Sequence, residues 1–264
     1  MKKNEHRPTE RVLDILEVLS SNTEGLTLTE IATAIEAPKS SILPVVHTMC
    51  SRKFIFMDKN TSKYTIGISS YYIGKSYSSS KNVLEFIKSE MRYIVKKSGE
   101  ICQLGILDGN KVLYIEKVDS DEPIRLISSI GKRLPAYCTS IGKSLLINKT
   151  LNELKELYPD GLKAFTQNTI TDFEKLEKEL IEAKTNGYAI EKSEINDYTS
   201  CISIPLLKDS KAIASLSVSI PTFRFSDEKF ELIKNILLEV RFKIETFFKE
   251  NDIDADIFMF NDVE

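Results

Sequence analysis

Hydrophobic residues recur at helical spacing in three short segments near the N-terminus. In RVLDILEVL, the apolar positions Val12, Ile15, Leu16 and Leu19 follow an i, i+3, i+4, i+7 pattern, which indicates one buried helix face. The pattern returns in residues 27–36 and 38–51. FIFMD and KYTIG then alternate around the polar turn KNTS, as the strands of a hairpin do. Three helices and a hairpin over residues 7–68 predict a winged helix-turn-helix.

Local sequence features predict where the second helix begins and which face of the third is exposed. Thr27 and Glu30 form a T-x-x-E capping box, which predicts a helix start at that point. In the third segment the apolar residues leave an opposite stripe of Ser40, Pro44, His47 and Ser51. Either Ser41 is the N-cap and Pro44 lies in the first turn, or the helix begins near Pro38 and kinks at Pro44.

Beyond residue 99 the pattern becomes mixed. Residues 101–118 predict two strands joined by an Asp-Gly-Asn turn, and IRLISSIGKRLPAYCT is predicted to be extended. Helices are predicted at SIGKSLLI, LNELKELY and 172–187, strands at AIEKSEI, CISIPLL and AIASLSVSI, and a final long helix after the cap Ser226. We therefore expect an α+β domain with a mostly antiparallel sheet over 99–249.

The remaining segments connect or terminate these domains. Within 69–98, SYYIGKSYSSSK is predicted to be a loop or loosely helical, and residues 82–98 a connecting helix. The acidic tail 250–264 is predicted to be disordered or loosely attached.

Composition narrows the class of protein. The 264 residues are 42% hydrophobic and 28% charged, as in soluble globular proteins of two domains. No apolar run approaches the roughly 18–20 residues of a membrane span, and MKKNEHRPTE lacks a signal-peptide core. We therefore expect a cytoplasmic protein. The four cysteines form no CxxC pair, so we expect neither a zinc site nor disulfides.

The net charge of −3 does not by itself indicate nucleic-acid binding, so any basic surface must be local. Basic residues do surround the third segment, and its outward face offers apolar and small polar side chains. Phosphate contacts position such a helix, and apolar groups pack on thymine methyls. This predicts an operator rich in A·T pairs opposite Leu43 and Pro44. The candidate DNA-contacting residues are Arg11, Lys39, Ser40, Ser41, Leu43, Pro44, His47, Arg52 and Lys63.

The order of several motifs resembles the IclR family of bacterial transcriptional regulators. RVLDILEVL, LTLTEIATAI, APKSSI and KYTIG resemble its winged N-terminal domain. RLISSIGKRLPAYCTSIGKSLL, NGYAIE, SCISIPL and SLSVSIP follow in the order of its effector domain. The resemblance implies a winged helix-turn-helix joined to a GAF-like effector-binding domain, acting as a homodimer or homotetramer on double-stranded operator DNA.

The same resemblance implies which residues bind a small organic-acid effector. They are Ser140, Ile141, Glu191, Cys201, Ser217 and Ser219, with Glu191 where the family commonly has an aspartate. Backbone N–H groups at the start of SIGKSLL and the serine hydroxyls suit a carboxylate. Family members often carry a polar or basic pair where Leu43 and Pro44 stand, so the operator sequence is not transferred.

Two other classes of function compete with this interpretation. A thiol enzyme built on Cys201 would need a base, but the only histidines, His6 and His47, lie in the N-terminal region. We therefore expect no catalytic residues, and no cofactor or metal. The second alternative is a ligand-binding interaction module that does not bind DNA.

Overall fold

The computed structural model describes residues 6–79, 83–122, 129–253 and 258. Its contacts divide the chain into two compact units, Met1–Leu84 and Glu85–Glu264. Each unit is described by itself below.

The first unit is a helical domain with a small antiparallel sheet. It contains the helices α1 (Arg7–Ser20), α2 (Leu28–Ala34), α3 (Lys39–Ser51) and α4 (Ile68–Ser79), and the strands β1 (Leu26–Thr27), β2 (Ile55–Met57) and β3 (Lys63–Ile66). The strand order is β1-β3-β2. The apolar faces predicted for the first three helices meet in one core, which includes Ile15, Leu19, Ile31, Ile42 and Val46. The predicted helices and hairpin are confirmed, and β1 adds a third strand.

The capping box predicted for α2 is present. The Thr27 hydroxyl accepts a hydrogen bond from the Glu30 N–H, and the Glu30 carboxylate accepts one from the Thr27 N–H at 2.8 Å. Two N–H groups that lack helical partners are thereby satisfied.

Of the two alternatives for SYYIGKSYSSSK, the loop is wrong and a helix is present as far as Ser79, where α4 ends; residues 80 and 81 lie outside the described residues. Tyr71, Tyr72 and Ile73 are all exposed, so no apolar stripe marked this segment as a helix. Its first turn is instead fastened by long-range bonds. The Ser69 and Ser70 hydroxyls donate to the backbone carbonyls of Arg52 and Phe54 at 2.8 and 2.9 Å.

The second unit is a sheet covered by helices on both faces. The strands are β4 (Ile101–Asp108), β5 (Lys111–Val118), β6 (Arg133–Pro135), β7 (Ala189–Lys192), β8 (Thr199–Lys208) and β9 (Lys211–Pro221). They pair antiparallel in the order β6-β5-β4-β9-β8-β7. The helices are α5 (Val83–Ser98), α6 (Ser140–Leu146), α7 (Leu151–Leu157), α8 (Phe173–Asn186) and α9 (Asp227–Glu250), with 3₁₀ turns η1 (Ala136–Cys138) and η2 (Thr222–Arg224).

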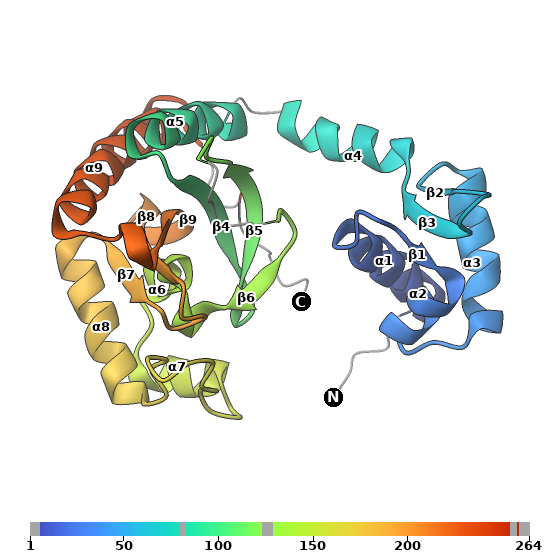
Figure 1. Cartoon of the computed structure of the whole chain (residues 1–264), viewed down its shortest axis with the longest axis horizontal. Coiled ribbons are helices and arrows are strands. Elements are labelled where there is room, and N and C mark those ends of the chain that lie inside the picture. Colours follow the sequence, from blue (N-terminus) through green and yellow to red (C-terminus); the bar gives the residue numbers. More distant parts are fainter. Residues whose placement is uncertain (1–5, 80–82, 123–128, 254–257, 259–264) are drawn as a thin grey trace. The chain divides into compact units, whose positions relative to one another are not determined.

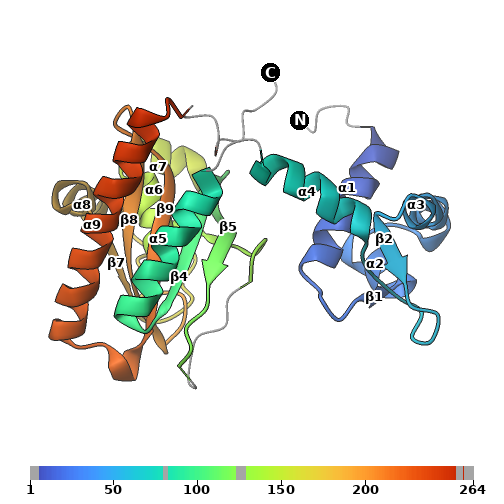
Figure 2. The same cartoon turned by 90° about the horizontal axis from the view of Figure 1, so that it is seen from above.

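Helices α5 and α9 lie side by side on one face of this sheet, and α6, α7 and α8 lie toward the other (Figures 1 and 2). Phe86 of α5 stacks on Phe247 of α9 with ring centroids 4.2 Å apart. Alternation along β9 directs Ser215, Ser217 and Ser219 to the same face, since Ser217 bonds to Ser140 of α6. The predicted α+β fold class and antiparallel sheet are confirmed.

A close backbone approach positions the start of α6. A Cβ atom at Gly142 would lie 2.0 Å from the carbonyl oxygen of Ala136, so only glycine allows η1 to pack here. Thr139 caps the helix by accepting from the Gly142 N–H at 3.2 Å. Ser140 is thereby held against the sheet.

Two sequence predictions fall partly on residues 123–128, 254–257 and 259–264, which lie outside the described residues. Of the stretch predicted to be extended, residues 133–135 form β6 and residues 136–138 a 3₁₀ turn. In the acidic tail, Ile253 and Phe258 are buried, so the prediction of loose attachment is wrong for these two residues.

Candidate functional site

The surface of α3 separates into the two predicted faces. Ile42, Val46 and Met49 are buried in the core of the first unit. Ser40, Leu43, Pro44 and His47 are exposed, and so are Lys39 and Arg52 at the two ends of the helix. Ser41 on α3, Arg11 on α1 and Lys63 on β3 are half-buried. The helix thus presents a ridge that is free of its own core.

Helix α3 runs continuously through Pro44. The helix begins at Lys39 with Pro38 in the N-cap position, so the alternative that Ser41 is the N-cap is wrong. The Ser41 hydroxyl instead donates to the Pro38 carbonyl at 2.6 Å. Pro44 has no N–H for the carbonyl four residues earlier, that of Ser40. Because both residues are on the exposed ridge, that carbonyl can be satisfied by water or by a partner.

A cavity of about 130 Å³ lies in the second unit between the start of α6 and the strands. Five of the six residues expected to bind an effector line it, namely Ser140, Glu191, Cys201, Ser217 and Ser219. The sixth, Ile141, does not line it: its side chain packs in the hydrophobic core with Val112 and Leu145. That one residue points away from the cavity because α6 turns its apolar side into the core.

The polar side chains of the cavity bond to one another across four elements, α6, β4, β8 and β9. The hydroxyls of Ser140 and Ser217 lie 3.0 Å apart. The Cys201 thiol donates to the Ser219 hydroxyl at 3.2 Å, which donates to Gln103 Oε1 at 2.9 Å. Ser219 is therefore already engaged as a donor, and the Ser140 and Ser217 hydroxyls share one hydrogen bond.

Glu191 is the acidic group among the described residues that line the cavity, and it is 1% exposed. One carboxylate oxygen accepts from the backbone N–H groups of Glu194 and Ile195, and the other, Oε2, is buried with no hydrogen-bond partner among the described residues. Burial raises the pKa of Glu191 to about 7, against the opposing effect of the Glu194 N–H. This carboxyl therefore changes its charge near neutral pH.

The thiol of Cys201 lacks the lowered pKa that a nucleophilic cysteine needs. Burial, followed by the nearby Glu191 carboxylate, raises its pKa well above the usual value. A reactive cysteine needs a lowered pKa, so this thiol stays protonated and acts as a hydrogen-bond donor.

Sequence reasoning missed several lining residues of this cavity: Gln103, Tyr114, Lys132, Leu134, Thr139, Ile195, Asn196 and Thr199. Gln103 carries a signal, because it is a polar residue in the otherwise apolar strand ICQLGIL. Tyr114, Lys132 and Asn196 come from other elements. Only the pairing of the strands and the loop between β7 and β8 bring them to α6.

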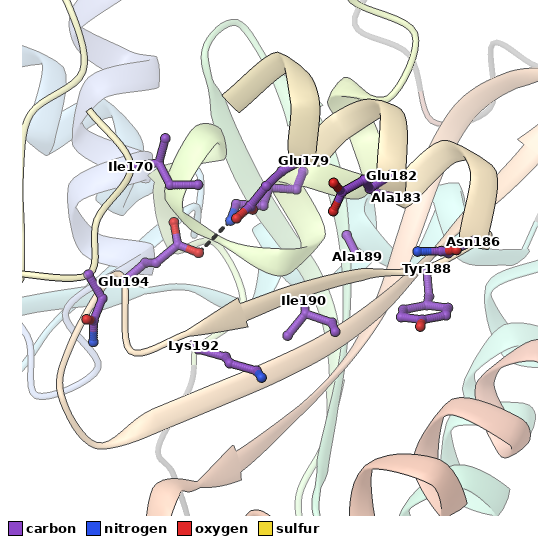
Figure 3. Close-up of a pocket in the computed structure, with 12 residues that line it drawn as sticks. Ile170, Glu179, Glu182, Ala183, Asn186, Tyr188, Ala189, Ile190, Lys192 and Glu194 are labelled. Carbon is purple, nitrogen blue, oxygen red and sulfur yellow. Dashed lines mark hydrogen bonds and ion pairs between the residues drawn. The ribbon is translucent and has the colours of Figure 1, made fainter. Parts of the chain in front are cut away.

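A second, more open cavity of about 500 Å³ lies between α8 and β7 (Figure 3). At its inner end the Lys143 ammonium lies 2.5 Å from carboxylate oxygens of both Glu179 and Glu194. Lys143 is 1% exposed and Glu179 is half-exposed. No sequence motif distinguished these three residues, which come from α6, α8 and the loop after β7.

Both units match sequence profiles of known domains. A sequence profile for the IclR helix-turn-helix domain matches residues 8–55, and one for the bacterial transcriptional regulator IclR C-terminal domain matches residues 75–246. The chain belongs to the IclR family of transcriptional regulators. It carries the DNA-binding helix-turn-helix domain of that family and its C-terminal effector-binding domain.

Individual members of the IclR family agree with this assignment. The chain is 30% identical over 235 residues to the HTH-type transcriptional regulator BhcR of Paracoccus denitrificans, covering 88% of this chain and 84% of that protein. An IclR regulator structure from Alicyclobacillus acidocaldarius superposes with a TM-score of 0.85 at 24% identity, covering 92% and 99% of the two chains. An IclR homologue from Microbacterium hydrocarbonoxydans, solved with 4-hydroxybenzoate, gives 0.80 at 23% identity with the same coverages.

Among the described residues, no helix has the length and apolar character needed to cross a membrane. The same part of the chain holds no group of three or more His, Cys, Asp or Glu side chains arranged to bind a metal ion. The relatives are named as transcriptional regulators.

Proposed function

We propose that this IclR-family regulator binds a small carboxylic acid in the cavity beside α6 and contacts its operator through the exposed ridge of α3. The observation that carries the proposal is the convergence of Ser140, Glu191, Cys201, Ser217 and Ser219 on that one cavity. The regulator acts as a homodimer or homotetramer in the cytoplasm, so that paired α3 helices meet paired half-sites.

The size of the cavity limits the effector. A cavity of about 150 Å³ holds one benzene ring, and this one measures about 130 Å³. A short aliphatic acid therefore fits better than a substituted ring. The similar Microbacterium structure binds 4-hydroxybenzoate, which supports the acid class and not the identity of the ligand.

The donors of the cavity support an acid as well. Of the two hydroxyl hydrogens of the Ser140–Ser217 pair one is used in the bond between them, and Asn196 and Lys132, which also carry N–H donors, line the cavity. Helix α6 has only seven residues, so these side chains contribute more than its dipole. Glu191 accommodates an anion when it is protonated, since two buried negative charges repel each other.

DNA recognition follows from the ridge on α3. Leu43 and Pro44 offer only apolar surface to a base pair, which favours a thymine methyl. Lys39 and Arg52 contact phosphates at the two ends of α3. Arg11 of α1 and Lys63 of β3 contact the DNA beside it. Ser40, Ser41 and His47 face the DNA from α3 between the two basic residues. Measured binding to operators with G·C pairs opposite the ridge tests this, and equal affinity for those operators would refute the thymine contact.

Effector binding changes operator affinity if the acid prefers one of two arrangements of the dimer. Helix α5 is the proposed transmitter. It follows α4 in the chain and packs on α9 through the Phe86–Phe247 stack.

A thermal-shift screen tests the effector site. Acetate, glycolate, lactate and pyruvate are added to the wild type, to Glu191→Ala and to Ser219→Ala. We expect at least one acid to raise the melting temperature of the wild type and to have a smaller effect on Glu191→Ala. A response of equal size in all three proteins contradicts the assignment of the cavity.

DNA titrations at several salt concentrations separate a regulator from an interaction module that does not bind DNA. A DNA-binding protein loses affinity steeply with salt, because its phosphate contacts release counterions. Cys201→Ala should retain an acid-dependent change in operator affinity. Loss of that change in Cys201→Ala but not in Cys201→Ser, which keeps a donor at this position, would instead indicate a specific role for the thiol.

A further inference from the structure

Lys143 is a charged side chain inside the second unit. Its side chain is 1% exposed, and its ammonium lies 2.5 Å from carboxylate oxygens of both Glu179 and Glu194. The two carboxylates differ, because the Glu194 side chain is 7% exposed and that of Glu179 is 44% exposed. Buried ion pairs often stabilise a fold no better than apolar residues of the same size, so their presence calls for another explanation.

Glu194 is held through all three of its polar groups. Its carboxylate accepts from Lys143. Its backbone carbonyl accepts from the Thr169 hydroxyl at 2.6 Å. Its backbone N–H donates to the carboxylate of Glu191. The residue therefore joins α6, the segment before α8 and β7 at one point.

The last of these bonds connects Glu194 to the proposed effector cavity. Glu191 is the only acidic residue that lines that cavity within the described part of the chain, and the Glu194 N–H fixes one of its two oxygens. The other oxygen, Oε2, has no hydrogen-bond partner among the described residues. Lys143 also lies three residues after Ser140 on α6, so the same short helix contributes directly to the cavity and indirectly through Glu194.

We propose that Lys143 is a positioning residue of the effector site: it anchors the Glu194 carboxylate, and the Glu194 N–H in turn orients the Glu191 carboxyl toward the bound acid. The inference rests on the proposed function, since it takes the cavity beside α6 as the effector site. Glu179 neutralises Lys143 from the solvent side and is not required for the orientation.

Two pairs of variants of the full-length protein test the anchor. Glu194→Gln keeps an oxygen that accepts from Lys143, whereas Glu194→Ala removes it and leaves Lys143 paired with Glu179. Lys143→Met/Glu194→Gln removes the ammonium without leaving an unpaired Glu194 carboxylate. Lys149→Met is the matched control, because the Lys149 side chain is 38% exposed, against 1% for Lys143, and pairs with Glu153 in the same unit.

The first readout is the NMR shift of the residue 194 amide proton between pH 5.5 and 8.5, measured without ligand. In the wild type, Glu194→Gln and Lys149→Met, this amide should report the titration of Glu191, because it donates to that carboxyl. In Glu194→Ala and in the double variant the response should fall by at least about half. A full response in either of them overturns the anchor, and Glu194→Ala keeps the test valid if the double variant fails to fold.

The second readout is the dissociation constant of the acid that stabilises the wild type most among acetate, glycolate, lactate and pyruvate. This constant should be about ten times higher in Glu194→Ala than in Glu194→Gln, as expected when the loss of the Lys143 contact leaves the Glu191 carboxyl without its fixed hydrogen bond. Equal affinities overturn the role in effector binding. If the wild type binds none of the four acids, the proposed function fails at that step, and the amide titration still decides whether Lys143 orients Glu191.

Discussion

The two candidate sites of this protein are built in opposite ways. On α3 the side chains face solvent, and their hydrogen bonds are local, such as that of Ser41 to the Pro38 carbonyl. In the effector cavity they are buried and bond across elements, as Ser140 does to Ser217, 77 residues away in the chain. An exposed site can change its specificity with little effect on stability, whereas a buried polar network couples function to folding.

The charges follow the same division. Lys39 and Arg52 are exposed on the first unit. Lys143, Glu191 and Glu194 are buried in the second. Substitutions in the first unit should therefore change mainly salt-dependent DNA binding, and those in the second should change stability, its pH dependence, or both.

The largest effect on stability is expected at Gly142, where α6 packs against the backbone of Ala136. Gly142→Ala places a Cβ atom 2.0 Å from the Ala136 carbonyl oxygen, and should cost the second unit at least about 3 kcal/mol of unfolding free energy. Differential scanning calorimetry of the full chain measures this. Gly74→Ala in α4 is the control, since nothing lies within 4 Å of its Cβ position, and it should stabilise the helix by about 1 kcal/mol. Equal losses in both variants would contradict the packing described.

The pH dependence of stability should reveal the buried carboxyl next. The pKa of Glu191 is raised from 4.5 to about 7 in the folded protein, so the native state holds a proton that the unfolded chain releases. The contribution of Glu191 to the free energy of unfolding is therefore fully present below about pH 4.5 and is lost as the pH rises through 7. Glu191→Gln removes this loss and should gain about 2 kcal/mol relative to wild type between pH 5 and pH 8. Urea unfolding at the two pH values tests it, and a pH-independent difference would be incompatible with a raised pKa.

A smaller gain of stability is expected at the ridge. Pro44→Ala restores an N–H inside α3, which should stabilise the first unit by between about 1 and 2 kcal/mol after the larger entropy of the unfolded alanine chain is counted. The same variant should weaken discrimination between A·T and G·C pairs opposite the ridge. Thermal unfolding and binding to paired operators measure the two effects separately. Unchanged discrimination would limit Pro44 to a structural role.

The smallest effect is expected for a single phosphate contact. Lys39→Ala should lower the slope of log affinity against log salt by about 1 and leave stability within about 0.5 kcal/mol of wild type. Lys178→Ala, an exposed lysine on α8 of the second unit, is the control and should leave the slope unchanged. If both variants lower the slope equally, the contact is not specific to the ridge.

Much of the secondary structure was readable because its signals are local. The capping box at Thr27, the Asp-Gly-Asn turn and the cap Ser226 each act over a few residues, and each is found where the pattern predicted it. The apolar stripe of α3 likewise determined which face of that helix is exposed. The family resemblance brought together residues of the cavity that no spacing rule connects.

The helices and strands with strong periodicity or caps, the buried face of α3 and the family could thus be read from the residues alone. Three features depend on packing: a serine-rich segment becomes α4, Ile141 lies in the core, and Lys143, Glu194 and Glu191 form one connected path. The physical reason is the distance along the chain over which each interaction acts. Caps and periodicity act between neighbours in the chain, whereas burial, pKa and the pairing of charges depend on groups that meet only after the sheet and helices have packed.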